Sequence, residues 1–139
     1  MSGLTATTVT TDSLVGSTSA NAIIVRGEGT ATTSLQQGLT KAWMNYKGTS
    51  TNSIRDSFNT TSVTDEGAGA YTQNITNSFS SADNSYAVSC QASDSADNGM
   101  YVLLQTFATG SFLFGARTAR TSAKADVPYI FPSINGDLA

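Results

Sequence analysis

The aromatic residues of this 139-residue chain are confined to one part of the sequence. No Phe, Tyr or Trp precedes Trp43, and all 12 aromatic residues lie between Trp43 and Phe131. Aromatic side chains provide much of the burial that holds a small core together. Residues 1–40 are rich in Thr, Ser and Ala and cannot bury enough apolar surface to fold alone. The sequence therefore predicts an extended attachment or oligomerisation arm over residues 1–40 and a compact module over residues 41–139.

Within the module, apolar and polar residues alternate with the period of two that is typical of β-strands. Polar or Gly-rich clusters separate these segments, as turns do. The segments that we expect to form strands are residues 42–47, 54–59, 62–64, 71–79, 86–92, 100–107, 111–117 and 127–134. Residues 63–79 are expected to form a hairpin in which Tyr71, Ile75 and Phe79 share a face with Gln73. The spacing indicates an all-β fold, an antiparallel β-sandwich of about seven short strands preceded by the extended arm.

Three segments give weaker local signals. The last strand carries Pro128 and Pro132, and proline cannot donate to a ladder, so we expect this strand at a sheet edge or as an extended tail. In the arm, residues 21–26 form the one plausible strand. Residues 33–42 place Leu35, Leu39 and Ala42 at helical spacing, although Gly38 weakens that helix.

Composition excludes several classes of partner. The net charge is −3 and only 12% of residues are charged, with no basic run of the kind that binding to nucleic acid requires. The chain has 19 Ser and 21 Thr residues, a hydroxyl-rich composition that is typical of extracellular β proteins. No apolar run approaches about 18 residues, so we expect no membrane insertion. The first residues lack the basic start and apolar centre of a signal peptide.

The residue types needed for most catalytic and metal sites are missing. There is no His, and the single cysteine, Cys90, lies in an alternating segment where we interpret it as a small buried hydrophobe. Zinc sites need several Cys or His ligands. The Gly-rich stretch at residues 67–69 is not expected to precede a helix, so it does not resemble a phosphate-binding loop. We therefore expect no cofactor, no metal and no enzymatic activity.

Acidic residues are the remaining chemical candidates. Asp65 with Glu66, and Asp94 with Asp97, could form the carboxylate pair of a glycan-degrading enzyme. Both pairs lie in predicted turns, where acidic side chains usually bind local backbone groups. Residues 94–99 offer oxygen ligands and a glycine but lack the spacing of an EF-hand, so a polar turn is the interpretation that we prefer to a calcium loop.

A run of residues at the start of the module resembles a known family. Its elements are Lys41-Ala42-Trp43, Asn45-Tyr46, Gly48-Thr49, Ile54-Arg55-Asp56-Ser57-Phe58-Asn59, Ser62-Val63-Thr64-Asp65, Gly67-Ala68-Gly69 and Tyr71-Thr72. This string resembles the small C-terminal-type β domain of tail-fibre-like virion proteins of tailed bacteriophages, in particular marine cyanophage-like ones. The resemblance covers about forty residues closely and the following strands only loosely. It implies a component of a phage particle, made in the host cytoplasm.

The sequence also suggests surfaces for interaction. Tyr46, Tyr86, Tyr101 and Tyr129 are candidates for stacking on sugar rings, although tyrosines often belong to a core or a subunit interface instead. Arg117 and Arg120, with Lys124, form the one basic cluster, which could face an acidic patch on a neighbouring virion protein or remain solvated. The candidate interaction residues are Tyr46, Tyr101, Arg117 and Arg120.

Together these features predict a non-enzymatic structural protein of the virion. We expect a tail-fibre or appendage subunit that forms a homotrimer. Residues 1–40 would contact other virion proteins, and the module could contact a host surface glycan or receptor. The alternative is a capsid decoration protein, of the cement or head-fibre type, whose arm binds the shell. An enzyme acting on cell-surface glycans is the third and least favoured interpretation.

Overall fold

The chain divides into two compact units, residues 1–36 and 37–139. This computed structural model describes residues 8–16, 22–26, 30–83, 85–94 and 99–139. The division falls between Gln36 and Gln37, four residues before the boundary expected from the aromatic distribution.

The first unit contains a small hairpin. Strand β1 (Ile24–Arg26) pairs with β2 (Thr32–Ser34), and the Leu35 amide donates to the Ile23 carbonyl at 2.8 Å. The helix expected over residues 33–42 is reduced to a single turn, α1 (Leu35–Gly38). That prediction was wrong over most of its length, because the glycine ends the turn and the chain enters a strand at Thr40. None of the residues of this unit whose burial the structure describes, 8–16, 22–25 and 30–36, is buried.

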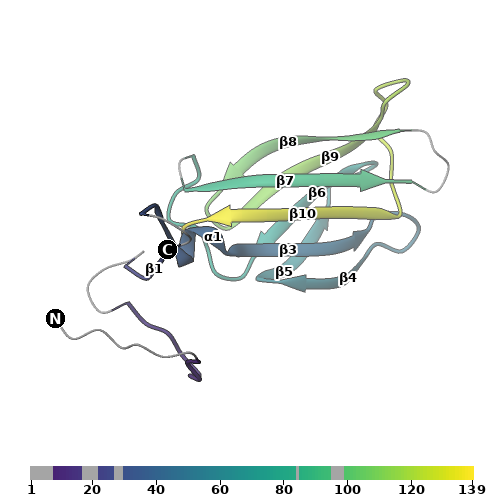
Figure 1. The fold of residues 1–139 in the computed structure, drawn as a ribbon. Helices are drawn as coiled ribbons and strands as arrows, with labels where there is room; N and C mark the ends of the chain where they lie inside the picture. The colour runs from purple at the N-terminus through teal and green to yellow at the C-terminus, as the bar shows by residue number, and fades with distance from the viewer. Residues whose placement is uncertain (1–7, 17–21, 27–29, 84, 95–98) are drawn as a thin grey trace. The chain divides into compact units, whose positions relative to one another are not determined.

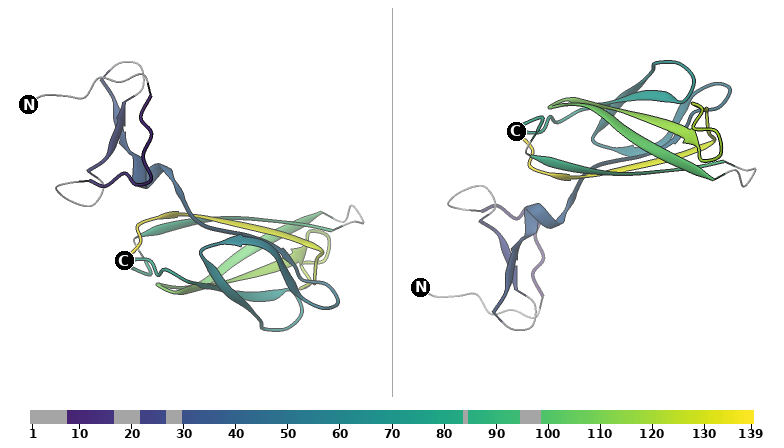
Figure 2. Two further views of the ribbon diagram at one scale, coloured as in Figure 1. Left: turned by 90° about the horizontal axis from the view of Figure 1, so that it is seen from below. Right: turned by 90° about the horizontal axis from the view of Figure 1, so that it is seen from above.

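The second unit is the predicted all-β sandwich, with eight strands in two antiparallel sheets (Figure 1). One sheet has the order β4-β3-β10-β7 and the other the order β5-β6-β9-β8. The strands are β3 (Thr40–Lys47), β4 (Ser53–Phe58), β5 (Thr60–Asp65), β6 (Ala70–Ile75), β7 (Tyr86–Ser93), β8 (Met100–Ala108), β9 (Ser111–Thr118) and β10 (Tyr129–Gly136). Figure 2 shows the two sheets as separate layers. The expected hairpin over residues 63–79 is present as β5 and β6. The two strands pair without a register shift from Asp65↔Tyr71 to Ser62↔Asn74.

The core lies between the two sheets. Along β3, Ala42, Met44 and Tyr46 are buried while the residues between them lie nearer to solvent, as the period of two requires. Other strands and loops complete the core with Tyr71, Ile75, Phe79, Phe112, Phe114, Ala116, Val127, Ile130 and Ile134. Six of these twelve residues are aromatic or isoleucine side chains of β6, β9 and β10, and burying each such side chain contributes about 1.5–3 kcal/mol.

The strand that carries the prolines lies at the centre of its sheet. We expected residues 127–134 at an edge or as a tail, but β10 pairs with β3 on one side and β7 on the other, so that prediction was wrong. Pro128 precedes the strand, and Pro132 pairs with Cys90 of β7. The pairing with β3 has partners at Ile130 and Ser133 but none at Phe131 or Pro132. Pro132, which has no amide hydrogen to donate, therefore lies where the β3 ladder has no partner, and it keeps its pairing with β7.

Candidate interaction surfaces

Tyr46, one of the four residues predicted to face a partner, lies in the core instead. It is 2% exposed, and its ring meets that of Tyr71 edge-on, with centroids 5.2 Å apart. Burial, together with the nearby charges of Asp65 and Asp126, raises the pKa of its hydroxyl above the ordinary value. Its expected role at a surface is thus corrected, because its side of β3 is the side that packs against the other sheet.

Tyr101 and Arg117 are brought together, since they pair across β8 and β9. Both are half-buried, and the Arg117 guanidinium donates to the carbonyl of Ser122 at 3.1 Å. Arg120 is exposed in the turn that follows β9. Lys124 and Arg117 form an isolated antiparallel β-bridge through their backbones. The guanidinium of Arg117 thus holds the turn that carries the other two basic residues, which gives this cluster a structural role.

The acidic pairs serve local structure where they are described. Asp65 accepts hydrogen bonds from the Asn52 amide at 2.5 Å and from the Gly67 backbone amide at 2.9 Å. Glu66 accepts from the Thr72 hydroxyl at 3.0 Å. Both carboxylates therefore accept hydrogen bonds from nearby groups of the turn and of strand β6. Asp97 and most of the loop considered for calcium lie outside the described residues, and within the described ones no three Cys, Asp or Glu side chains gather as metal ligands.

Aromatic side chains form an oblique row on the outer face of the sheet β4-β3-β10-β7. The row consists of Phe58, Trp43, Phe131 and Tyr129, and we call it the aromatic band. Phe58 and Trp43 are directly opposite each other on β4 and β3. The register of β3 with β10 places Trp43 opposite Ser133 and Phe131 two residues further along, which makes the two rings diagonal neighbours. The rings of Phe131 and Tyr129 stack at an angle of 17°, with centroids 6.3 Å apart.

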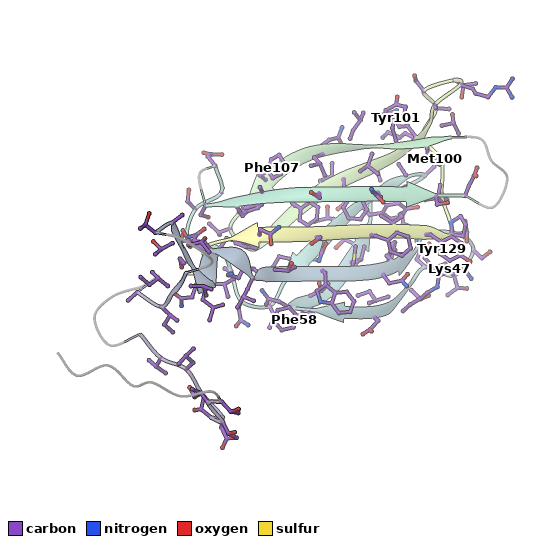
Figure 3. All side chains as sticks on the ribbon, in the orientation of Figure 1. Lys47, Phe58, Met100, Tyr101, Phe107 and Tyr129 are labelled. Carbon is purple, nitrogen blue, oxygen red and sulfur yellow. The ribbon has the colours of Figure 1, made fainter. Side chains whose placement is uncertain are left out.

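All four side chains of the aromatic band reach solvent. Their exposed fractions are 37% for Trp43, 54% for Phe58, 43% for Tyr129 and 42% for Phe131. Figure 3 labels Phe58 at one end of this row and Tyr129 at the other. Only Tyr129 was among the tyrosines considered for sugar stacking. Sequence reasoning missed the other three, although the alternation placed Trp43 on the opposite side of β3 from Met44 and Tyr46.

Arg55 fixes the end of the aromatic band. Its guanidinium lies 4.7 Å from the centroid of the Tyr129 ring, within cation–π range. The same group donates to the Pro128 carbonyl at 2.6 Å and to the Asn45 side-chain carbonyl at 3.2 Å. A register shift between β3 and β4 next to Asn45 directs Arg55 across β3 toward β10. One side chain therefore connects three strands on this face and restrains the Tyr129 ring.

The outer face of the other sheet has a different character. Around β5 and β6 its side chains bond to each other: the Asn74 amide donates to Ser62 at 3.0 Å and to Thr64 at 3.2 Å, and the hydroxyls of Thr61 and Thr76 lie 2.9 Å apart. Such ladders of hydroxyl and amide groups stabilise the pairing of β5 with β6. The aromatic band is thus a feature of one sheet, whereas the exposed large apolar side chains of the other sheet, Leu103, Leu104 and Phe107, lie on β8.

Cys90 faces the interior as expected for a small apolar residue. It is half-buried on β7, and burial raises the pKa of its thiol to about 12.

Among the described residues, no helix is long and apolar enough to cross a membrane. Comparisons with protein families, with curated proteins and with solved structures give no match for this chain.

Proposed function

We propose that this protein is a non-enzymatic structural component of a tailed-phage virion, a tail-fibre or appendage subunit that assembles as a homotrimer. The observation that carries the proposal is the apolar exposure of the first unit. Val9, Leu14, Val15 and Ile24 are 59–79% exposed, and no residue of this unit whose burial the structure describes is buried. A segment of this kind gains order and covers its apolar side chains by packing against other chains. Sister subunits and neighbouring virion proteins would supply that cover.

Several residues of the string that resembles the tail-fibre domain have structural roles in the sandwich. Ala42, Tyr46 and Tyr71 of the resembling string are core residues. Gly48 is a position where a Cβ would overlap the Tyr71 hydroxyl. These positions explain why a string of this composition suits a small β domain. They support the fold that the resemblance implies, and the virion assignment remains our proposal.

The short length of the strands favours the alternative, a capsid decoration protein. The longest strand has 9 residues, which corresponds to about 30 Å at the rise of a β-strand. A module of this length does not span a distance as a fibre must, whereas a decoration protein only has to cover a shell. In this alternative the arm would clamp neighbouring shell proteins.

Cryo-electron microscopy of the assembled particle distinguishes the two. An appendage predicts a few threefold copies at the tail, and a decoration protein predicts hundreds of copies across the shell. Sedimentation analysis of the purified chain tests the trimer separately. A chain that is missing from purified particles would overturn both candidate functions.

A further inference from the structure

The four rings of the aromatic band are left exposed by the described part of the chain. These rings lie on β4, β3 and β10 on one face of the sheet, and each is more than one third exposed. Exposed aromatic side chains gathered in this way mark recognition sites more often than scattered ones do. The restraint of Tyr129 by Arg55 lowers the entropy that its ring loses on binding.

Polar side chains border the aromatic band on both sides. Asn45 pairs with Asp56 on one side, where Lys47 and Arg55 also lie. Gln91 pairs with Phe131 on the other side, next to Ser89 and Ser93 of β7. The amide of Gln91 and the ammonium of Lys47 make no hydrogen bond with any residue that the structure describes. These side chains are free to bind the hydroxyl groups of a ligand on the rings.

We propose that the aromatic band binds a neutral glycan chain of the bacterial cell surface. Sugar rings present apolar C–H faces, which pack on aromatic rings, and a margin of hydroxyl groups, which bind amide, carboxylate and ammonium groups. A row of rings one side chain wide, bordered by such groups, fits a linear oligosaccharide lying across the three strands. The border carries Lys47, Arg55 and Asp56, so its charges of both signs do not select a polyanion. This inference rests on the proposed function, which places the module outside the cell.

A second copy of the chain fits the surface less well. Half-exposed rings of these four residues offer about 400 Å² of apolar surface, which is close to the apolar share of the roughly 800 Å² that each partner gives to a stable interface. Size alone therefore does not distinguish the two occupants. Protein interface cores are depleted in Lys, Asp and Ser, however, and these residue types lie directly beside the rings. The border of the aromatic band therefore favours a sugar chain.

The fluorescence of Trp43 can report binding, because Trp43 is the only tryptophan of the chain and lies in the aromatic band. The full chain is titrated with cellohexaose, chitohexaose and laminarihexaose, up to about ten times a Kd of about 1 mM. We expect a saturable change in Trp43 emission with at least one of them, because the stacking uses a C–H face that all three offer. Phe58→Ala and Phe131→Ala should each weaken binding by about tenfold or more, and Gln91→Ala by a smaller factor.

Phe107→Ala is the matched control. Phe107 is 42% exposed, like Phe131, but lies on β8 of the other sheet. It should leave the affinity unchanged, and circular dichroism confirms that each variant is folded. Absence of a saturable change with all three hexaoses overturns the inference, as does an equal loss in the Phe107 variant. Self-association that Phe131→Ala abolishes would assign the surface to a second copy and would also overturn it.

The copy number of the chain in particles separates this inference from the proposed function. Particles assembled with the Phe131→Ala chain should contain the normal number of copies. A chain that is present in particles but binds no hexaose overturns only the glycan inference. A chain that binds the hexaose but is missing from particles overturns the virion assignment.

Discussion

The hydroxyl of Tyr71 donates a 2.7 Å hydrogen bond to the carboxylate of Asp126, which is 55 residues away in the sequence. The ring of Tyr71 is fully buried in the core, and the same carboxylate oxygen accepts a 2.6 Å bond from the Gly69 amide. The carbonyl oxygen of Gly48 lies 3.2 Å from the same hydroxyl, whose single proton is therefore shared between the two acceptors. One phenol therefore connects the β3–β4 turn, the β5–β6 turn and the segment before β10 at one end of the sandwich.

Removal of this hydroxyl should weaken the fold. Tyr71→Phe keeps the ring in the core but leaves the Gly48 carbonyl and one side of Asp126 without their donor. We expect a loss of about 1–3 kcal/mol in the free energy of unfolding, the usual cost of an unsatisfied buried group. Urea denaturation measures it. Tyr101→Phe, which removes the hydroxyl of a half-buried tyrosine on β8, should cost less than half as much. Equal losses in the two variants would contradict this role of Tyr71.

The buried tyrosines should make the fold sensitive to alkali. Burial is the first cause that raises the pKa values of Tyr46, Tyr71 and Tyr86 above 10.0, and for Tyr71 the bond to Asp126 adds to it. Above pH 10 the unfolded chain releases protons that the folded chain retains, so the free energy of unfolding falls as pH rises. Below about pH 9 this contribution is constant. Retention of the Tyr71 proton gives a slope of about 1.4 kcal/mol per pH unit.

Urea midpoints between pH 8 and pH 11 measure this dependence. Tyr71→Phe should reduce the slope above pH 10, because the variant lacks one of the retained protons. A midpoint that stays constant up to pH 11 would show that the three phenols ionise as readily in the folded chain as in the unfolded one.

Cys90 should be unreactive in the folded chain. Its pKa of about 12 leaves almost no thiolate at pH 8, and its side chain faces the core side of β7. Ellman's reagent should therefore react slowly with the native protein and quickly in urea. The matched control moves the thiol by one residue, as Cys90→Ser combined with Ser89→Cys, which turns it to the solvent face. Similar native rates for the two proteins would contradict the burial of Cys90.

Two glycines of one turn separate backbone strain from lack of space. Gly67 has φ of 106°, and a Cβ added there would have no atom within 4 Å. Gly69 has φ of 62°, and its Cβ would lie 2.5 Å from the Ala125 amide nitrogen. Gly67→Ala should cost about 1–2 kcal/mol, the cost of a left-handed conformation. Gly69→Ala should cost clearly more, because backbone atoms must also move. Thermal denaturation compares the two, and equal losses would show that the turn relaxes around Gly69.

Local patterns were sufficient to predict the sandwich but not the position of every strand. The alternation along β6 correctly placed Tyr71, Gln73 and Ile75 on one side, because residues two apart share a face. The central position of β10 was missed, because a proline reads as an edge signal and its compatibility with a gap in the β3 pairing depends on register. Register between strands about 90 residues apart is set by tertiary packing, which no local pattern records.

The aromatic band was missed for a related reason. β3 carries one aromatic residue on each side, Trp43 and Tyr46, so aromatic content alone could not tell which side is buried. Asn45 and Lys47, the polar residues on the same side as Trp43, were the signal that Tyr46 is the core residue, and our prediction of Tyr46 at a surface did not use it. Phe58 and Phe131 join Trp43 only through the pairing of three strands. The sequence pattern therefore identified the individual aromatic residues, but it could not predict that they lie close together.

The sandwich should fold without the first unit. Ala42 is the first buried position among the described residues, and all twelve core residues lie at or beyond it. Deletion of residues 1–36 should therefore leave the urea midpoint, followed through Trp43 emission, within about 0.5 kcal/mol of the full chain. The deletion removes the exposed apolar side chains Val9, Leu14 and Val15, so the shortened chain should no longer enter particles. A longer deletion through residue 44, with the reporter placed by Phe114→Trp, removes Ala42 and Met44 from the core and should abolish cooperative unfolding. If the shorter deletion already prevents folding, the first unit stabilises the sandwich and its role as an attachment arm is contradicted.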